Sequence, residues 1–527
     1  MSATNNASKN AAWLAAAMLI VCAESPFAAT PGDACDGIHA GLPQPLALAA
    51  SWDPALVREV HSHAARQAFA RGCSLVLAPT LDVARDARRG SVERTFGEDP
   101  YLVGEMGVAA IEGLQGRGTT PGSAKVTAAA MHLAGPSLPG EGSEVGPVPV
   151  AERELREVYF PPFEAAIARA NLRAIVVSGN ELDGIPSIVN TWLLKDVVRG
   201  EWKYPGALLA ASDAIADLHT VHGVAADNAN DAFRLATEAG IESIDRSWST
   251  EAAPLDASAR TFALKAAQRS IVLLKNDGTL PATAAANVLV IRIGEGDAAS
   301  QQARVDAAKA TGRPVVLVLT SPRSPITVKM SEQANAVLAA WNLGDAAEAA
   351  IADVLSGRVN PGGKLPLTLS RNAGQMPAFY NVKPSARRGY LFDTTDPLYT
   401  FGSGLSYSTF TLGAPKLSAT TMDAKGSIDV SVEVRNSGKV AGDETVQLYI
   451  RDKVSSVTRP VMELKGFQRI TLKPGEARTV TFKIDARSLS MWNEKMQRVV
   501  EPGDFEIMTG NSSARLQSAT LTVRAAP

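Results

Sequence analysis

Between residues 40 and 245, short apolar segments that end in polar loops alternate with amphipathic stretches, and this alternation constrains the fold more than any other feature. The apolar segments are residues 73–86, 125–135, 172–184 and 206–213. Such an alternation predicts a parallel α/β architecture, and a β/α barrel is the form that we expect. In a barrel the working residues follow the strand ends. The positions to inspect are therefore Asp86, Arg88, His132, Asn180 and Asp213.

Two further regions follow the expected barrel. Residues 262–411 contain apolar strand patterns at 287–293 and 313–321 and a helical pattern at 345–357, which together predict a second α/β unit. Residues 414–527 change character, because short alternating strands are separated by turn signals. This last pattern is typical of an all-β sandwich.

The composition is that of an ordinary globular protein, with a formal charge of −2 at pH 7 and 46% apolar residues. Nothing in this balance favours nucleic acid or an anionic membrane, since both require a clustered basic surface. Residues 13–23 form an apolar run that, with the small residues near Ala28 and Ala29, predicts a signal peptide over 1–29 and export to the periplasm or exterior. A retained anchor, a lipoprotein acceptor at Cys22 and a cytosolic chain are the alternatives.

Six motifs occur in the order in which one enzyme family carries them. They are FGEDPYLVGEMGVAAIEGLQG (96–116), ERELREVYFPPFEAAI (152–167), DGIPSIVNTWLLKDVVRGEW (183–202), SIVLLKNDGTLP (270–281), NPGGKLPLTLS (360–370) and PLYTFGSGLSYSTF (397–410). Through them the chain resembles glycoside hydrolase family 3, the β-glucosidase and β-xylosidase family. The resemblance implies a barrel over 30–250, an α/β sandwich over 262–411 and a fibronectin type III-like domain over 414–527.

The resemblance also implies retaining hydrolysis of β-linked sugars without a cofactor. That reaction needs two carboxyl groups about 5 Å apart, one acting as the nucleophile and the other as the general acid/base. Aligned on both flanks, the family's nucleophile falls on Ala211, which has no lone pair to offer an anomeric carbon. Asp213 lies two residues later. It is either a displaced nucleophile or, as we expect, the N-cap of the helix that follows.

The other sugar-contacting positions that the resemblance implies are partly replaced. Asp36, Arg88 and His132 are retained as candidate substrate-binding residues. The lysine expected beside the histidine, an arginine and a tyrosine are replaced by Met131, Ser91 and Gly179. A sugar site needs converging polar groups to replace the water that each hydroxyl loses. We therefore expect binding of a β-linked oligosaccharide or glycoside to be weak or lost.

Two segments that the family carries are missing from this sequence. Only a short stretch separates the predicted cleavage site from Asp36, where the family places the first barrel strand and helix. Residues 298–311 replace a long insertion that normally holds the acid/base. Glu295 is nearby, and we expect it to be a surface residue.

Histidines and cysteines offer few further sites. His61 and His63 would not share a helix face, and His219 and His222 have no third ligand, so we expect no metal and interpret the second pair as a solvated helix end. The sequence leaves open whether Cys35 and Cys73 form a disulfide.

Three hypotheses about function remain. The favoured one is an exported, catalytically inactive family relative that keeps a sugar-binding or interaction role. The second is an active retaining exo-β-glycosidase that uses Asp213. The third is a product without a defined role, whose incomplete barrel leaves strand edges open and folds poorly.

Overall fold

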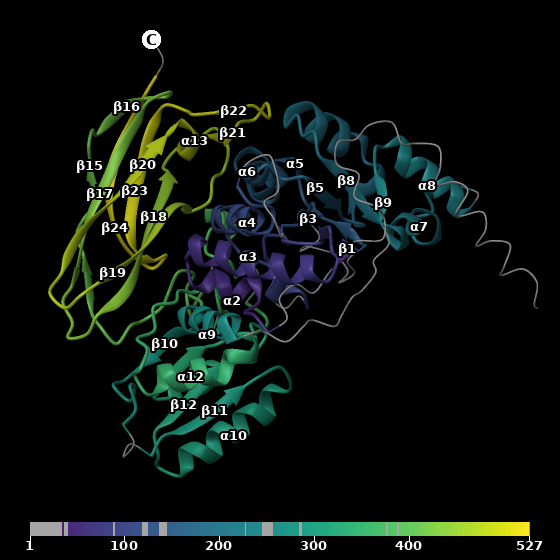
Figure 1. The fold of residues 1–527 in the computed structure, drawn as a ribbon. Coiled ribbons are helices and arrows are strands. Elements are labelled where there is room, and N and C mark those ends of the chain that lie inside the picture. The colour runs from purple at the N-terminus through teal and green to yellow at the C-terminus, as the bar shows by residue number, and fades with distance from the viewer. Residues whose placement is uncertain are drawn as a thin grey trace, which may run out of the picture.

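The computed structural model describes residues 34–35, 41–87, 90–117, 125–135, 145–226, 228–244, 257–283, 287–375, 378–386, 389–390 and 392–525. Three bodies follow one another along the chain, as Figure 1 shows from purple to yellow. The segment predicted as a signal peptide, residues 1–29, lies outside the described residues, as do Cys22, Asp36 and Arg88.

The first body is built on a six-stranded parallel sheet in the order β1-β2-β3-β5-β8-β9. The strands are β1 (Ala34–Cys35), β2 (Leu75–Val76), β3 (Thr127–Leu133), β5 (Ala174–Val177), β8 (Ala207–Ala211) and β9 (Glu242–Ile244). Strands buried on both faces are continuously apolar, as β5 is throughout. The strand order follows the chain, as in a barrel wall, and the predicted barrel-type fold is confirmed. Among the described residues, β1 and β9 are the two edges of this wall.

Helices cover the outside of the wall. They are α2 (Pro45–Ala50), α3 (Pro54–Ala70), α4 (Pro100–Gln115), α5 (Glu152–Glu154), α6 (Pro161–Ala170), α7 (Ser212–Thr220) and α8 (Ala229–Glu238). Turns of other helical types are η2 (Val92–Arg94), η3 (Leu155–Tyr159), η4 (Ser187–Val189) and η5 (Trp192–Glu201). A small sheet, β4 (Pro147–Val148), β6 (Glu181–Leu182) and β7 (Ile185–Pro186), lies beside the wall. The motif at 152–167 is occupied by α5, η3 and the start of α6.

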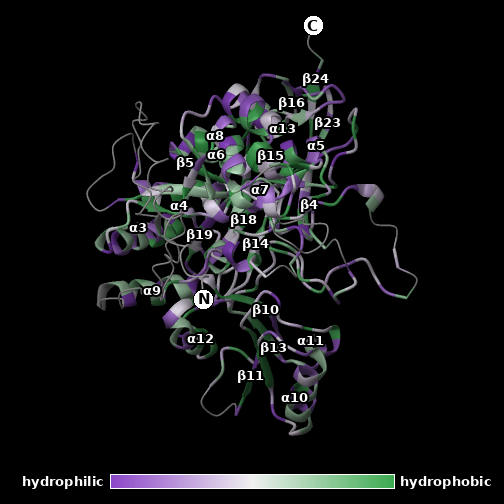
Figure 2. Cartoon of the chain, turned by 90° about the vertical axis from the view of Figure 1, so that its right-hand side faces the viewer, coloured by the Kyte–Doolittle hydropathy of each residue, from purple (hydrophilic) through white to green (hydrophobic). Residues whose placement is uncertain are grey.

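The second body is a four-stranded sheet in the order β10-β13-β12-β11, in which β10 is antiparallel to β13 and the other pairs are parallel. Its strands are β10 (Val272–Asn276), β11 (Leu289–Ile293), β12 (Val315–Leu319) and β13 (Ala336–Ala339). Its helices and turns are α9 (Ala257–Ser270), α10 (Ala298–Ala310), α11 (Val328–Gln333), η7 (Gly344–Ala346), α12 (Ala347–Leu355) and η8 (Pro384–Ala386). Figure 2 colours the strands of this sheet mainly as hydrophobic, in keeping with the apolar cores on both faces.

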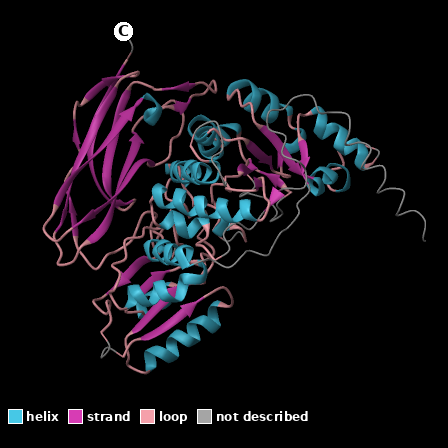
Figure 3. Cartoon of the chain, in the orientation of Figure 1, coloured by secondary structure: helices cyan, strands magenta, loops and turns pink. Residues whose placement is uncertain are grey.

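The third body is a β-sandwich, seen as the long magenta strands at the left of Figure 3. One sheet joins β14 (Phe410–Leu412), β15 (Lys416–Leu417), β17 (Ser427–Asn436) and β20 (Ala477–Asp485). The other joins β16 (Thr421–Asp423), β24 (Arg515–Arg524), β23 (Gly503–Ser512), β18 (Gly442–Asp452) and β19 (Glu463–Leu472). The helix α13 (Ala486–Leu489) and the pair β21 (Met491–Trp492) and β22 (Arg498–Val499) complete it. Burial alternates along β17, as the predicted sandwich requires.

Two buried carboxylates at the start of α4 join the three bodies. Glu98 accepts hydrogen bonds from the Thr368 N–H at 2.6 Å, the Thr368 hydroxyl at 2.7 Å and the Tyr380 N–H at 2.9 Å. Asp99 caps α4 by accepting from the Leu102 N–H, and it also accepts from the Tyr380 hydroxyl at 2.7 Å. The same hydroxyl accepts from the N–H of Leu464 on β19 at 2.7 Å. Barrel, second body and sandwich therefore meet at one hydrogen-bonded cluster, which we call the Glu98 cluster.

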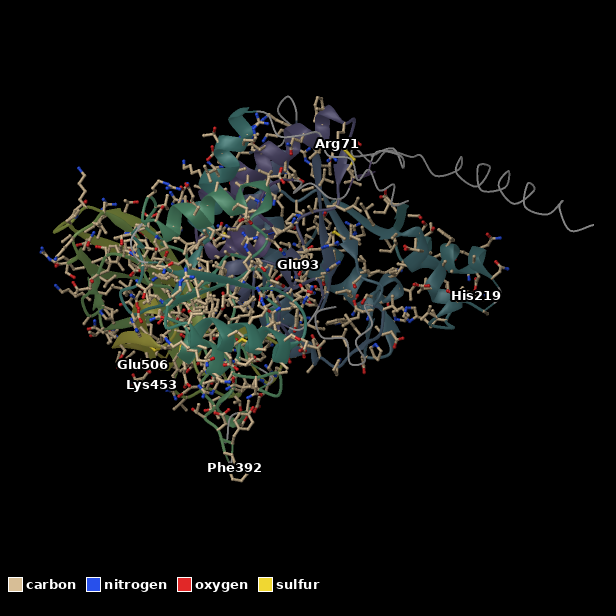
Figure 4. All side chains as sticks on the ribbon, turned by 90° about the horizontal axis from the view of Figure 1, so that it is seen from below. Arg71, Glu93, His219, Phe392, Lys453 and Glu506 are labelled. Carbon is tan, nitrogen blue, oxygen red and sulfur yellow. A yellow bond between two sulfur atoms is a disulfide. The ribbon has the colours of Figure 1, made fainter. Side chains whose placement is uncertain are left out.

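A disulfide between Cys35 and Cys73 settles the pairing that the sequence left open. It ties edge strand β1 to the residues that precede β2, and Figure 4 shows it in yellow near Arg71. The bond encloses a sequence separation of 38 residues. A cross-link of this kind restricts the unfolded chain and holds an edge strand that has only one neighbour in the described sheet.

Replacing both cysteines by serine should lower the free energy of unfolding by about 2–4 kcal/mol, because the unfolded chain gains the freedom that the cross-link removed. Urea unfolding of the double variant and of the parent, each with and without reductant, measures this. Reductant should destabilise the parent alone. Equal stability of the two proteins under oxidising conditions would contradict the assignment.

The Glu98 cluster should make stability depend on pH. Burial raises the pKa of Glu98 from its usual 4.5 to about 7, against the lowering effect of the bonds from Thr368 and Tyr380. The folded protein therefore binds the carboxyl proton of Glu98 more tightly than the unfolded chain does. The contribution of the protonated Glu98 carboxyl to the free energy of unfolding is complete below pH 4.5. It is lost as the pH rises to about 7, and it amounts to roughly 1.4 kcal/mol for each unit of pKa shift.

Glu98→Gln removes this titration, so its unfolding free energy should fall less between pH 5 and pH 7 than that of the parent. Urea unfolding at unit pH intervals measures the difference, and Glu433→Gln, an exposed position on β17, is the matched control. Parallel pH profiles for the parent and Glu98→Gln would show that the Glu98 carboxyl does not titrate in this range.

Candidate functional site

A cavity of about 770 Å³ lies between the barrel and the second body. On the barrel side it is lined by residues that follow β2 and end β3, including Thr80, Met131 and His132. On the other side it is lined by Arg292 near the end of β11, by Thr320 after β12 and by the residues that follow β13. The carboxyl ends of parallel strands from two sheets thus converge on one space, which is where α/β folds place ligand sites.

Close backbone packing closes one end of this cavity. Gly344 has a φ of +73°, and a Cβ there would lie 2.5 Å from the carbonyl oxygen of Gly41. The N–H of Gln44 donates to the carbonyl of Asn342 at 3.0 Å. The segment from Gly41 to Gln44, which leads into α2, therefore packs directly against the loop after β13. This contact fixes the distance between the barrel side and the second-body side of the cavity.

His132 is the one predicted substrate-binding residue that lies within the described residues. It lines the cavity, and its Nδ1 lies 3.2 Å from Oδ2 of Asp82. The Asp82 side chain is buried, while 19% of the His132 side chain is exposed. Because a carboxylate oxygen only accepts, Nδ1–H is the donor, which leaves Nε2 as the ring atom free to face a ligand.

Met131 lies beside His132 in the cavity wall and is buried. Its thioether replaces the ammonium group that the family resemblance places there, so this wall offers an apolar contact instead of three donors.

Gly179 occupies the position at which the family resemblance implies a tyrosine. A Cβ built on Gly179 would meet Val145 Cγ1 at 3.4 Å and Ala214 Cβ at 3.7 Å. Val145 and the start of α7 therefore bound the space into which a tyrosine side chain would grow.

The predicted strand at 206–213 ends at Ala211, and α7 begins at Ser212. Ala211 is 2% exposed, so the position of the expected nucleophile carries a buried methyl group. The expectation that Asp213 is the N-cap is wrong, because the extended residue before the helix is Ala211 and Asp213 is the second helical residue. The strand runs directly into the helix, so the cap lies two residues earlier in the chain than expected.

Asp213 is exposed, and its Oδ1 accepts from the N–H of Ala214 at 2.8 Å. A carboxylate in the first turn is favoured by the positive end of the helix dipole, which explains this residue without a catalytic role. Asp213 is not among the described residues that line the cavity. In Figure 4, His219 on the same helix lies well apart from Glu93 of the cavity wall.

The surroundings of Glu295 do not suit a general acid. About half of its side chain is exposed, as expected, and its Oε1 accepts from the Ser321 hydroxyl at 2.7 Å and from Arg323 at 2.5 Å. These hydrogen bonds, from Ser321 and then from Arg323, lower the pKa of Glu295. A general acid needs the opposite change, a raised pKa that keeps the proton available near neutral pH.

The interpretation of His219 and His222 as a solvated helix end is wrong for His222. The His222 side chain is 1% exposed, its Nδ1 lies 2.9 Å from Glu181 Oε1 and its Nε2 lies 3.1 Å from the carbonyl oxygen of Gly179. Helix α7 ends at Thr220, and the chain then folds back so that the ring reaches the loop after β5. His222 thus fixes the loop that contains Gly179.

Several residues of the site were not selected from the sequence. Asp82, the partner of His132, follows the apolar run that ends near residue 77, and this position after a strand was the signal that could have found it. Glu93, Arg94, Arg292 and Glu348 also line the cavity. Their sequence contexts are ordinary, and only the packing of two bodies brings them together.

Within the described residues, no group of three or more His, Cys, Asp or Glu side chains is placed to hold a metal ion. Helices long and apolar enough to cross a membrane do not occur in the part of the chain that the structure describes.

Comparison with known proteins gives a consistent result. Family models match the glycosyl hydrolase family 3 N-terminal domain at residues 33–248, the family 3 C-terminal domain at 295–407 and a fibronectin type III-like domain at 444–513. A β-xylosidase of Formosa agariphila is 33% identical over 635 residues, with 92% of this chain and 88% of the relative covered. A periplasmic β-glucosidase of Salmonella typhimurium is 30% identical, with 93% and 85% covered.

Solved structures agree with these relatives. The β-glucosidase from Listeria innocua in complex with glucose has a TM-score of 0.87 at 27% identity, with 93% of this chain and 87% of that chain covered. A β-glucosidase from Erythrobacter marinus has a TM-score of 0.86 at 26% identity, with the same coverage.

His222→Leu should lower the free energy of unfolding by about 1–3 kcal/mol, because the carbonyl of Gly179 and the carboxylate of Glu181 each lose a buried partner. His222→Gln keeps a side-chain donor and should lose less. Urea unfolding of both variants tests this. A change within about 0.5 kcal/mol for His222→Leu would instead fit an exposed side chain.

Proposed function

The chain belongs to glycosyl hydrolase family 3, and from this premise we propose that it is an exported protein that binds a β-linked glycoside without hydrolysing it. One observation carries the proposal. The strand end that should present the nucleophile presents Ala211, whose buried methyl group cannot form a glycosyl intermediate.

Among the described residues that line the cavity, no carboxylate is without a nearby cation. Asp213 is exposed on α7, and its carboxylate is bonded to the backbone of its own helix. The cavity wall holds Glu93 and Glu348, each of which faces a cation. Glu348 pairs with Arg292, and Glu93 Oε2 lies 3.9 Å from Arg323. Retaining hydrolysis needs one carboxylate free to attack and a second that holds a proton, about 5 Å away.

The acid/base side of the site supports the same proposal. Glu295 has a lowered pKa and is held by Ser321 and Arg323, so it favours the ionised form. The alignment with the Formosa agariphila relative spans 635 residues, more than the 527 of this chain, so the relative carries segments that this chain lacks. A missing acid/base loop is consistent with that difference.

Residual glycoside binding is supported by the cavity and by the fixed ring of His132. The space has the size of a ligand site, and Asp82 holds His132 in one orientation at its wall. Asp36 and Arg88 remain proposed substrate contacts on the family resemblance alone. Export is supported by the apolar run at 13–23 and by the disulfide between Cys35 and Cys73, since such bonds persist in oxidising compartments.

A panel of aryl β-glycosides tests the proposal. We expect the parent, Asp213→Ala and Glu93→Gln to release aryl alcohol no faster than a protein-free control. A family 3 β-glucosidase run alongside shows that the assay works. Turnover by the parent that Asp213→Ala abolishes would make Asp213 a displaced nucleophile, and turnover that Glu93→Gln abolishes would assign the role to Glu93. Either result would overturn the proposal.

The panel is informative only for a folded protein, so cooperative urea unfolding of the parent is measured first. A gradual, non-cooperative transition would favour the hypothesis of a chain that folds poorly and would contradict a binding function.

A further inference from the structure

A second space in the barrel, which we call the Trp192 groove, has a volume of about 850 Å³ and shares no lining residue with the cavity described above. Its walls come from β4 and the residues that follow it, from the β6–β7 hairpin and from the start of η5. The volume lies within the range of small-molecule sites and exceeds the need of a single sugar ring.

The Trp192 groove lies at the same end of the barrel wall as the cavity. Val148 and Leu155 of its lining pack against Gly135, where a Cβ would lie 3.6 and 3.8 Å from their side chains. Gly135 follows β3, and the end of β3 lines the cavity through Met131 and His132. Two separate spaces therefore lie beside the carboxyl end of one strand, which is where β/α barrels place ligand sites.

The ring of Trp192 is held in place from inside the barrel. The Phe160 ring centroid lies 6.2 Å from that of Trp192, and the Arg156 guanidinium carbon lies 5.8 Å from it. Trp192 nevertheless remains partly exposed and lines the groove, and its indole N–H donates to no acceptor among the described residues. A fixed aromatic ring with a free donor is thus presented to a ligand.

Two further polar groups of the groove have atoms left for a ligand. Asn190 is 3% exposed, and its Oδ1 accepts from the Leu193 N–H at 3.1 Å. The structure describes no acceptor for the two N–H groups on Nδ2 of Asn190, and an amide buried to this degree normally has one. The Asp183 carboxylate is exposed and pairs with no cation among the described residues.

The backbone fixes the position of Asp183. Asp183 and Gly184 join the antiparallel strands β6 and β7, and their φ angles are +53° and +74°. Positive φ at both residues of a two-residue hairpin turn matches the twist of the flanking strands. The turn therefore holds the Asp183 carboxylate at the groove without help from a side-chain partner.

The lining favours an uncharged ligand. Among the described residues its ionisable side chains are Glu152 and Asp183, and Glu152 Oε1 bonds to Arg156 at 2.6 Å. Most other lining residues are apolar, as Leu182 and Ile185 are. A sugar ring matches this wall, because its C–H face can stack on an indole while its hydroxyls donate to a carboxylate and accept from an amide.

An extended peptide suits the groove less well. It would bind by adding a strand to the sheet β4-β6-β7, but Pro147 lies in one edge strand and Pro186 in the other. Proline has no N–H to donate to an added strand. Polyproline peptides bind in grooves lined by several aromatic rings, and Trp192 is the one aromatic residue in the described lining.

We propose that the Trp192 groove is a second carbohydrate site, which binds an uncharged glycan chain with one sugar ring stacked on Trp192. Asn190 and Asp183 bind the hydroxyls of that chain. The inference goes beyond the proposed function, because it uses other residues and does not require the cavity to be occupied.

Calorimetric titration with cellohexaose and with xylohexaose, both in excess methyl β-D-glucoside to occupy the cavity, tests the inference. The parent should bind at least one of the two chains, and Trp192→Leu should weaken that binding about tenfold because the stacked ring is lost. Trp202→Leu is the matched control. Trp202 follows the other end of η5 and also packs on Phe160, at 5.2 Å, but does not line the groove, so this variant should bind as the parent does.

Asn190→Asp is a second variant, which keeps the oxygen that accepts from Leu193 and removes the amide donors. It should also weaken binding several-fold, and it keeps the inference testable if Trp192→Leu does not fold. Equal affinity of the parent and of the folded groove variants would overturn the inference, as would a folded parent that binds neither chain.

Two further results would also overturn the second site. Displacement of the hexasaccharide by methyl β-D-glucoside would place the chain in the cavity. Binding of a decaproline peptide that Trp192→Leu abolishes, without binding of either glycan, would assign the groove to a peptide.

Discussion

The packing of the three bodies depends on the carboxylates of Glu98 and Asp99, which lie where the chain enters α4 and accept hydrogen bonds from Thr368 and Tyr380 of the second body. A buried carboxylate is tolerated only when donors surround it, and here the donors come from Thr368 in the second body and from Tyr380, which also bonds to β19. Removing one donor would leave a charge without a partner. The cluster therefore holds the barrel against the second body, and that contact creates the cavity.

The proposed loss of hydrolysis is compatible with a stable fold, because the Glu98 cluster and the cavity wall consist of different residues. Glu98, Asp99 and Thr368 lie in two of the six family motifs, 96–116 and 360–370, and their hydrogen bonds stabilise the assembled fold. Ala211, Met131 and Gly179 occupy positions where the family resemblance implies polar groups. A buried methyl group at 211 and an apolar side chain at 131 are compatible with a well-packed interior. The fold does not require polar side chains at these positions.

Much of the fold was predictable from local pattern. The strands that became β3, β5, β8, β11 and β12 are apolar runs, and the sandwich strands alternate, so periodicity identified them. The start of α7 and the environment of His222 were not predictable, because they depend on where β8 stops and on how the chain turns after Thr220. The cavity was also not predictable as a set of residues. Glu93, Arg94, Arg292 and Glu348 meet only through packing between the two bodies.

We propose that no carboxylate of this protein attacks an anomeric carbon. The most direct measurement is the intact mass of the protein after prolonged incubation with an activated 2-deoxy-2-fluoro-β-glucoside or xyloside, which traps the glycosyl intermediate of a retaining enzyme. We expect an unchanged mass under conditions in which an active family 3 β-glucosidase is fully labelled. A mass increase of one fluoroglycosyl unit, mapped to a peptide containing Asp213 or Glu93, would contradict it.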